Sequence, residues 1–212
     1  MKVRSEDELL RLSDDERVWR IKELTVIRGE CVSGPETKRA ALRRAAVPIA
    51  YAHWEGFVKK VGQSYLEYVA TRKLTLAELS ICFQSLYFSV ENAGDLRKTK
   101  RHLLVPILRR LKDNGGDKVH IKTRDAVSTQ SNLNSEVLED ICVNLGLNFS
   151  SFSQQTAFID KILLGRRNSI AHGESLPLSE VDLDDLVHNV VSCIDIFKNE
   201  VENAAVTKAY LA

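Results

Sequence analysis

The chain has 212 residues, of which 44% are hydrophobic and 28% are charged. These are ordinary values for a globular protein, and they exclude a chain that is disordered throughout. Thirty basic residues against 29 acidic ones give a formal net charge of +1, so a nucleic-acid site would have to be a local feature of the surface. We expect a single domain spanning residues 1–212.

Three features predict a cytoplasmic protein without a membrane partner. The first residues lack the apolar core of a signal peptide, and no apolar run approaches the roughly 20 residues that span a bilayer. The cysteines lie far apart within apolar segments and form neither a CxxC pair nor a zinc-type spacing with histidine. We therefore expect buried free thiols in a reducing compartment and no metal or other cofactor at Cys31, Cys82, Cys142 or Cys193.

Helical spacing of apolar residues dominates the first third of the chain. Two capping boxes, one starting at Ser5 and one at Ser13, predict a short first turn followed by a helix from about residue 14 to residue 30. A longer helix is predicted over residues 36–71, and Pro48 should kink it because proline lacks an amide donor and crowds the preceding turn.

Two basic segments are candidates for contact with RNA or a partner. Near the start of the long helix, a run from Lys38 to Arg44 has a solvated helix face as its commoner meaning, with RNA or partner contact as the alternative. A third helix, capped by Thr75 and ending near Asn92, leads to the most basic segment of the chain. Its candidate RNA-binding residues are Arg97, Lys98, Lys100 and Arg101.

The remaining chain predicts more helices and no sheet. Residues 118–133 alternate poorly and are expected to be irregular, with at most a short extended piece. Asn134 or Ser135 caps a short helix, Ser153 opens another that Gly173 closes, and Ser179 or Asp182 begins the last. Because no strand-helix-strand rhythm occurs, the predicted fold is an all-α, single-domain helical bundle with a long kinked second helix.

One polar cluster stands out in the helix that Gly173 closes. Within Arg167-Asn168-Ser169-Ile170-Ala171-His172, an arginine, a carboxamide and an imidazole share about two helical turns. Histidine titrates near neutral pH and can transfer a proton at a ribose hydroxyl, while the arginine fork suits phosphate oxygens. Asparagine can orient the imidazole or hold an oxygen of the substrate. We expect Arg167, Asn168 and His172 to be catalytic without a metal ion.

An ideal helix does not direct these side chains to one point. Arg167 lies about 140° round the axis from His172, so a second helix would be needed to complete the site, and a symmetry-related subunit is one source of it. Arg166 falls on the core face, whereas Asn168 and His172 share the far side with Gly165. Because glycine costs about 1 kcal/mol in a helix, we expect another backbone or a ligand to approach there.

The spacing of arginine and histidine is a weak signal by itself. The alternative meaning is an exposed helix end at which two cations interact favourably with the helix dipole. The residues nevertheless resemble the Arg-x4–6-His signature of the HEPN superfamily, and Tyr51-Ala52-His53-Trp54-Glu55-Gly56-Phe57 resembles the second helix of the MAE-type and RiboL-PSP-type HEPN families.

The resemblance implies an α-helical endoribonuclease that needs no metal and leaves a 2′,3′-cyclic phosphate and a 5′-hydroxyl. Such domains act as toxins or in defence against phage, and two protomers bring their motifs together in a homodimer. An antitoxin or operon partner would follow from that role. Not every HEPN domain is active, so a catalytically inactive RNA- or protein-binding helical module is the alternative function.

Two further residues are possible supporting members of the site. Arg166 also satisfies the loose family spacing to His172, but Asn168 directly follows Arg167, which favours Arg167. Glu55 lies opposite the apolar stripe of its helix, where it is either a surface charge or a partner that orients a residue such as Arg167.

Overall fold

The computed structural model describes residues 3–91, 109, 112, 116, 118–121, 123 and 127–212. Helices make up 71% of the structure. The described part contains no named strand and only two isolated bridges, Thr75 with Lys118 and Leu79 with Leu211. Its elements are α1 (Glu6–Glu30), α2 (Glu36–Thr71), α3 (Ile81–Glu91), α5 (Ser135–Leu145), the 3-10 helix η2 (Phe149–Phe152), the π-helix η3 (Phe158–Leu164), α6 (Gly165–Ala171) and α7 (Glu180–Val206). The all-α prediction is confirmed.

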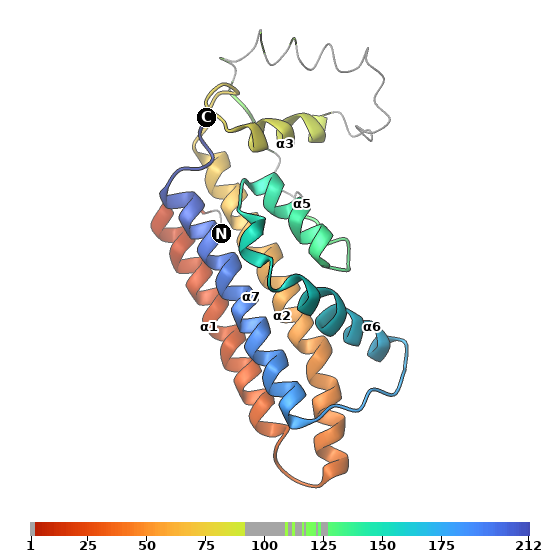
Figure 1. Ribbon diagram of the computed structural model, residues 1–212. Helices are drawn as coiled ribbons and strands as arrows, with labels where there is room; N and C mark the ends of the chain where they lie inside the picture. The colour runs from red at the N-terminus through yellow and green to blue at the C-terminus, as the bar shows by residue number, and fades with distance from the viewer. Residues whose placement is uncertain are drawn as a thin grey trace.

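Helices α1, α2 and α7 lie side by side as the long part of the molecule (Figure 1). Ion pairs show that α1 and α7 are antiparallel: the end of α1 meets the start of α7 through Arg28 and Asp184, at 2.6 Å, and Arg17 pairs with Asp195 further along. Helix α2 is unbroken over its 36 residues and continues through Pro48. No helix among the described residues is long and apolar enough to cross a bilayer.

The first helix starts earlier than residue 14. Ser5 accepts a hydrogen bond from the Glu8 amide, and the Glu8 carboxylate accepts from the Ser5 amide, so the first capping box is the one that forms. Ser13, the predicted cap, is buried inside α1 and its hydroxyl donates to the Leu10 carbonyl at 2.8 Å. The separate first turn was a wrong prediction because Leu9, which is fully buried, holds that turn in the core.

The third helix starts later than predicted. Thr75 does not cap a helix; its amide and hydroxyl both donate to the Glu78 carboxylate at 2.8 Å, and α3 begins only at Ile81. The C-terminal tail explains the shift, because the Ser80 amide donates to the Tyr210 carbonyl at 2.8 Å and holds this segment in a turn. The candidate RNA-binding residues of the next segment, Arg97, Lys98, Lys100 and Arg101, lie outside the described residues.

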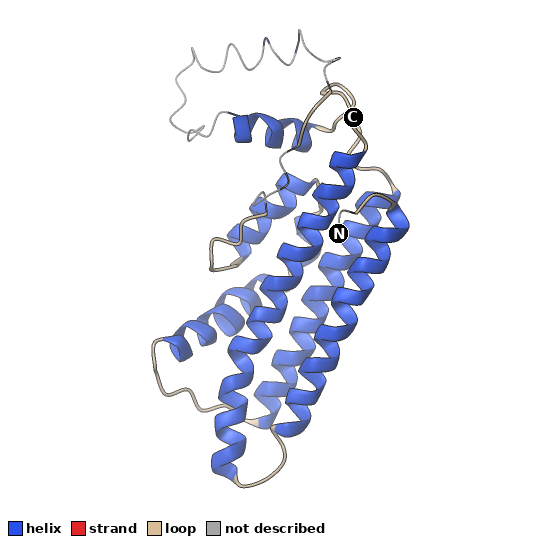
Figure 2. Cartoon of the chain, turned by 180° about the vertical axis from the view of Figure 1, so that it is seen from behind, coloured by secondary structure: helices blue, strands red, loops and turns tan. Residues whose placement is uncertain are grey.

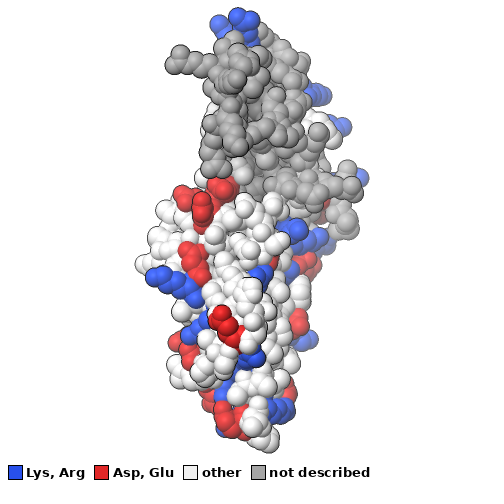
Figure 3. All heavy atoms as spheres, turned by 90° about the vertical axis from the view of Figure 1, so that its right-hand side faces the viewer, with Lys and Arg blue, Asp and Glu red and all other residues white. Residues whose placement is uncertain are grey.

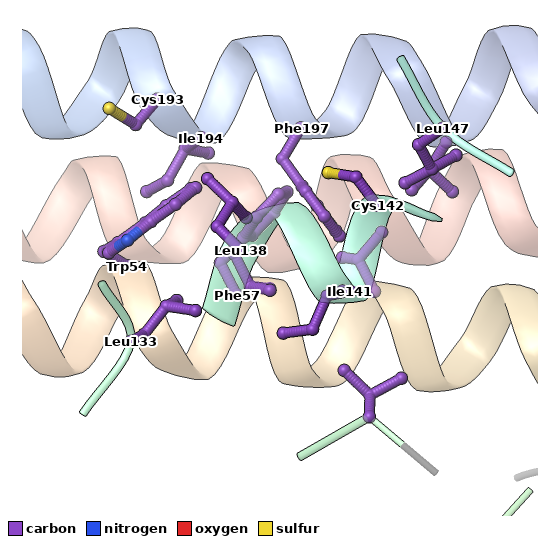
Figure 4. Close-up of a cluster of buried hydrophobic side chains, with 14 of the residues drawn as sticks. Trp54, Phe57, Leu133, Leu138, Ile141, Cys142, Leu147, Cys193, Ile194 and Phe197 are labelled. Carbon is purple, nitrogen blue, oxygen red and sulfur yellow. The ribbon is translucent and has the colours of Figure 1, made fainter. Parts of the chain in front are cut away.

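The core joins α2, α7 and α5. Trp54 and Phe57 of α2 meet Ile194 and Phe197 of α7 in one apolar cluster, against which Leu138 of α5 packs (Figure 4). The Trp54 and Phe197 rings are perpendicular, with centroids 6.4 Å apart, an arrangement that aromatic pairs favour. This cluster fixes α5 and the loop before it against α2, and that loop forms one side of the candidate site.

All four cysteines are free, as the sequence predicts. Burial raises the pKa of the Cys142 and Cys193 thiols to about 12, so both remain protonated at neutral pH.

Candidate functional site

The helix that carries the Arg-Asn-His cluster is irregular. The predicted continuous helix from Ser153 is instead the 3-10 helix η2, a turn, the π-helix η3 and the short α-helix α6. Helices of π type are rare and recur at functional sites because they change the register of the side chains that follow them. The angles of an ideal α-helix therefore do not apply to the residues before Gly165, because those turns are π-helical.

Gly165 marks the junction between η3 and α6. Its amide donates to the carbonyls of Asp160 and Ile162, and the first of these bonds spans five residues. A Cβ atom at this position would lie 3.3 Å from the Asp160 carbonyl oxygen. The close approach predicted at Gly165 is thus made by the preceding π turn of its own helix.

The side chain of Asp160 ties the π-helix to α5. One carboxylate oxygen accepts from the Ser135 amide at 2.7 Å and the other from the Ser135 hydroxyl at 2.6 Å. Asn134, the N-cap, accepts from the Val137 amide at 2.8 Å. Two acceptors thus serve the start of α5, where unpaired amides and the helix dipole both favour negative charge.

Arg167 faces back onto the protein. Its Nη1 donates to Oδ1 of Asn132 at 3.1 Å and to Oδ1 of Asn168 at 2.7 Å, while Nη2 donates to the Ser131 carbonyl at 3.0 Å. The guanidinium carbon lies 4.5 Å from the centroid of the Tyr51 ring, within the range of a cation–π contact. Contacts from α2, from the loop before α5 and from α6 therefore fix Arg167.

Tyr51 and Glu55 lie one turn apart on α2 and hold that loop. The buried Tyr51 hydroxyl accepts from the Leu133 amide at 2.6 Å, and Glu55 accepts a hydrogen bond from the buried Thr129 hydroxyl. Burial first, and then the neighbouring Glu55 carboxylate, raise the pKa of Tyr51 to about 12. Among the described residues, no hydrogen bond or ion pair joins Glu55 to Arg167. Glu55 is therefore linked to Arg167 indirectly, through Tyr51 and the loop that contains Thr129.

His172 lies at the opposite end of α6. It is the C-cap residue, and its backbone amide donates to the Asn168 carbonyl at 2.9 Å. Gly173 follows with φ +80°, which confirms the predicted end of the helix at a left-handed glycine. The His172 side chain is exposed and has no hydrogen bond or ion pair within the described part of the chain.

Arginines of α2 anchor the loop that follows His172. Arg44 donates to the Glu174 carbonyl and Arg43 to the Leu178 carbonyl, each at 2.7 Å. Seen from behind, this loop leaves the outer end of α6 and crosses to the start of α7 beside the first turns of α2 (Figure 2). These two members of the basic run from Lys38 to Arg44 therefore bind the protein's own backbone.

Arg166 points to a different partner from Arg167. Its Nη2 lies 2.9 Å from Oδ1 of Asp182, and the side chain is 22% exposed. Asp182 also completes the capping box of α7 with Ser179. Hydrogen bonds from Ser179, and after them the one from Arg166, lower the pKa of Asp182 to about 2. Arg166 is thus partly buried, and its guanidinium is paired with a carboxylate, which offsets the cost of placing a charge on the inner side of the helix.

The structure thus joins the Arg167 and Asn168 side chains, whereas the His172 side chain forms no hydrogen bond with either among the described residues. On the side from which α6 projects, the described surface mixes Lys and Arg with Asp and Glu and shows no large basic patch (Figure 3). Among the described residues, no three His, Cys, Asp or Glu side chains are placed to hold a metal ion.

Sequence reasoning did not single out Asn132, Ser131 or Tyr51 as neighbours of Arg167. Asn132 and Ser131 belong to the segment predicted to be irregular, where no periodicity places a side chain. In the sequence, Tyr51 stands out only as part of the stretch that resembles the second helix of HEPN families.

The all-α architecture with its long second helix agrees with the fold expected of a HEPN-type domain. The RiboL-PSP-HEPN family matches residues 15–203. The chain therefore belongs to the RiboL-PSP-HEPN family. Comparison with curated proteins and with solved structures found no match.

Proposed function

We propose that this protein is a metal-independent endoribonuclease of HEPN type. The observation that carries the proposal is Arg167, which is fixed by contacts with three elements and belongs to the same short motif as an exposed histidine. A guanidinium fixed in this way suits a phosphate whose charge grows during the reaction. Membership of a family whose superfamily includes many ribonucleases supports an RNA substrate.

The proposed reaction is attack of a ribose 2′-hydroxyl on the adjacent phosphorus. His172 takes the proton from the 2′-oxygen or gives one to the departing 5′-oxygen, and Arg167 stabilises the phosphorane between these steps. The new bond joins the 2′-oxygen to phosphorus and the bond to the 5′-oxygen breaks. The products are a 2′,3′-cyclic phosphate and a 5′-hydroxyl, and Asn168 acts by holding Arg167.

The complete site is proposed to lie across a homodimer. Within one chain Arg167 faces α2, whereas the exposed His172 side chain shares no hydrogen bond or ring contact with Arg167 among the described residues. A two-fold axis near α6 would place His172 of one protomer beside Arg167 of its partner.

The deciding experiment is incubation of purified protein with a mixed RNA substrate in EDTA. We expect cleavage by the wild-type protein and a loss of about 100-fold or more in His172→Ala, as expected for a general acid or base. His188→Ala is the matched control, because His188 is also exposed and lies on α7. Equal cleavage by wild type and His172→Ala would contradict the proposal. RNA binding without cleavage would favour the inactive binding module.

A biological role as a toxin or in phage defence is part of the proposal, with an antitoxin or operon partner that keeps the enzyme silent. Expression in a bacterial host should arrest growth, and His172→Ala should relieve the arrest. Growth arrest that persists in the variant would argue against a toxin acting through cleavage.

The basic segment is proposed to contact the RNA backbone. Replacing Arg97, Lys98, Lys100 and Arg101 with glutamine should weaken binding and reduce the dependence of log K on log salt by about 0.7 for each lost phosphate contact to single-stranded RNA. Affinities measured at several salt concentrations test this. An unchanged salt dependence would show that these charges do not contact phosphate.

A further inference from the structure

The hydrogen bonds of Arg167 fall on only part of its guanidinium. Nη1 donates to two acceptors, the side-chain oxygens of Asn132 and Asn168, and Nη2 donates to one, the Ser131 carbonyl. A guanidinium carries five N–H donors. The Nε hydrogen and one Nη2 hydrogen therefore have no acceptor among the residues that the structure describes. Nε and Nη2 form one edge of the planar fork, which can bind two oxygens of a phosphate at once.

The loop that provides two of these acceptors has a costly backbone conformation. Gln130 and Ser131 have φ values of 51° and 61°, in the left-handed region that non-glycine residues seldom adopt. Such conformations persist where surrounding contacts enforce them. Here Glu55 binds Thr129 on one side of the strained pair, and Tyr51 binds the Leu133 amide on the other.

Tyr51 therefore acts on Arg167 in two ways. Its hydroxyl fastens the loop whose Ser131 carbonyl and Asn132 side chain accept from Arg167, and its ring lies against the guanidinium face. Since Tyr51 is 2% exposed on the long helix α2, its ring is a fixed surface. Asn132 then sets the rotation of the guanidinium within its plane.

We propose that Tyr51 and Asn132 are positioning residues for Arg167, which hold its Nη1 side against the protein and present its Nε and Nη2 edge to a phosphate. The inference rests on the proposed ribonuclease function for the identity of that phosphate as an RNA phosphodiester. The placement of Arg167 itself follows from the contacts alone, so the two parts are tested separately.

The catalytic test compares kcat and KM for one RNA oligonucleotide. Misplacing a catalytic group by about 1 Å costs about 100-fold, so we expect Tyr51→Leu and Asn132→Ala to lower kcat by about tenfold or more with little change in KM. Asn132→Asp, which keeps the acceptor, should retain activity. Tyr65→Leu is the matched control, because Tyr65 is another buried tyrosine of α2 and makes no contact with Arg167.

A second readout does not depend on cleavage. The Nε–H signal of Arg167 in an NMR spectrum, assigned with Arg167→Lys, should lie away from that of a free arginine and shift when inorganic phosphate is added. Tyr51→Leu should return the signal to the free position, and Tyr65→Leu should not. Because Asn132 is exposed, Asn132→Ala keeps the test available if Tyr51→Leu does not fold.

The outcomes separate the two proposals. If folded Tyr51→Leu and Asn132→Ala leave both kcat and the Arg167 signal unchanged, or if Tyr65→Leu alters both equally, the positioning role is overturned. If the wild-type protein cuts no RNA but its Arg167 signal depends on Tyr51 and responds to phosphate, the ribonuclease proposal fails while the positioning role stands.

Discussion

Neighbouring arginines of α6 have different partners. Arg166 pairs with Asp182 at the start of α7, whereas Arg167 lies against Tyr51 and the loop before α5. Successive residues on an α-helix point about 100° apart, so one ties α6 to α7 while the other faces α2. The preference for Arg167 as the catalytic arginine remains a prediction, and the partner of Arg166 gives it an alternative, structural role.

A prediction at the residue scale concerns Asp182. Its folded pKa of about 2 lies below the ordinary value of 3.8, so the carboxylate stabilises the fold above pH 3.8 and this contribution is lost as pH falls towards 2. Asp182→Ala should lower Tm at pH 7 by about 2–4 °C, the equivalent of roughly 1 kcal/mol in a protein of this size.

Thermal unfolding of the wild type and of Asp182→Ala from pH 7 down to pH 2 measures this effect. The difference in Tm should narrow between pH 4 and pH 2, because the wild-type carboxylate becomes protonated there. If the difference in Tm between the wild type and Asp182→Ala stays constant from pH 4 to pH 2, Asp182 stabilises the fold through packing and not through its charge. Cleavage of RNA at pH 7 and below Tm should be largely retained in the variant.

At the element scale, the π-helix links two other elements of the site. It carries Asp160, which caps α5 through Ser135, and it sets the register of α6, which carries Arg167. The Asp160 carboxylate thus fixes Ser135, directly after the loop, and the Arg167 guanidinium binds Ser131 and Asn132 within the loop.

Asp160→Ala should destabilise the protein by about 1–2 kcal/mol, because two donors of Ser135 lose their acceptor. Denaturant unfolding measures this loss, and hydrogen exchange should show faster opening at the start of α5. Asp140→Ala is the control, since Asp140 is an exposed aspartate within α5, the helix that Asp160 caps. Equal stability of the two variants would mean that the Asp160 cap contributes nothing measurable.

At the scale of the whole molecule, helix α6 projects away from the three long helices α1, α2 and α7, and its C-terminal end lies at the outer edge of the molecule (Figure 1). An exposed histidine at that end, separate from an arginine that faces inward, is an arrangement that a second copy can complete. If the proposed homodimer forms the site, activity should depend on protein concentration in the range where that dimer dissociates.

Mixing two inactive variants tests the shared site. Arg167→Ala and His172→Ala should each be inactive. In the proposed homodimer, a mixed dimer would contain one site with an intact arginine from one chain and an intact histidine from the other. Random exchange makes half of the dimers mixed, so about one quarter of the wild-type activity should return if the two sites act independently. If heterodimers form but no activity returns, the shared site is wrong in this form. Either each site uses Arg167 and His172 of the same chain, or each site needs both arginines and both histidines of the dimer.

Local sequence determined the helical class, the span of α2 and the end of α6 at Gly173, because periodicity, capping and left-handed glycines act between residues close in the chain. Only the tertiary structure decided the π-helix, the strained loop before α5 and the contact of Arg167 with Tyr51. Neighbouring residues in the sequence either disfavour these features or do not specify them. They form because residues far apart in the sequence supply the hydrogen bonds that hold the loop and the Tyr51 ring that contacts Arg167.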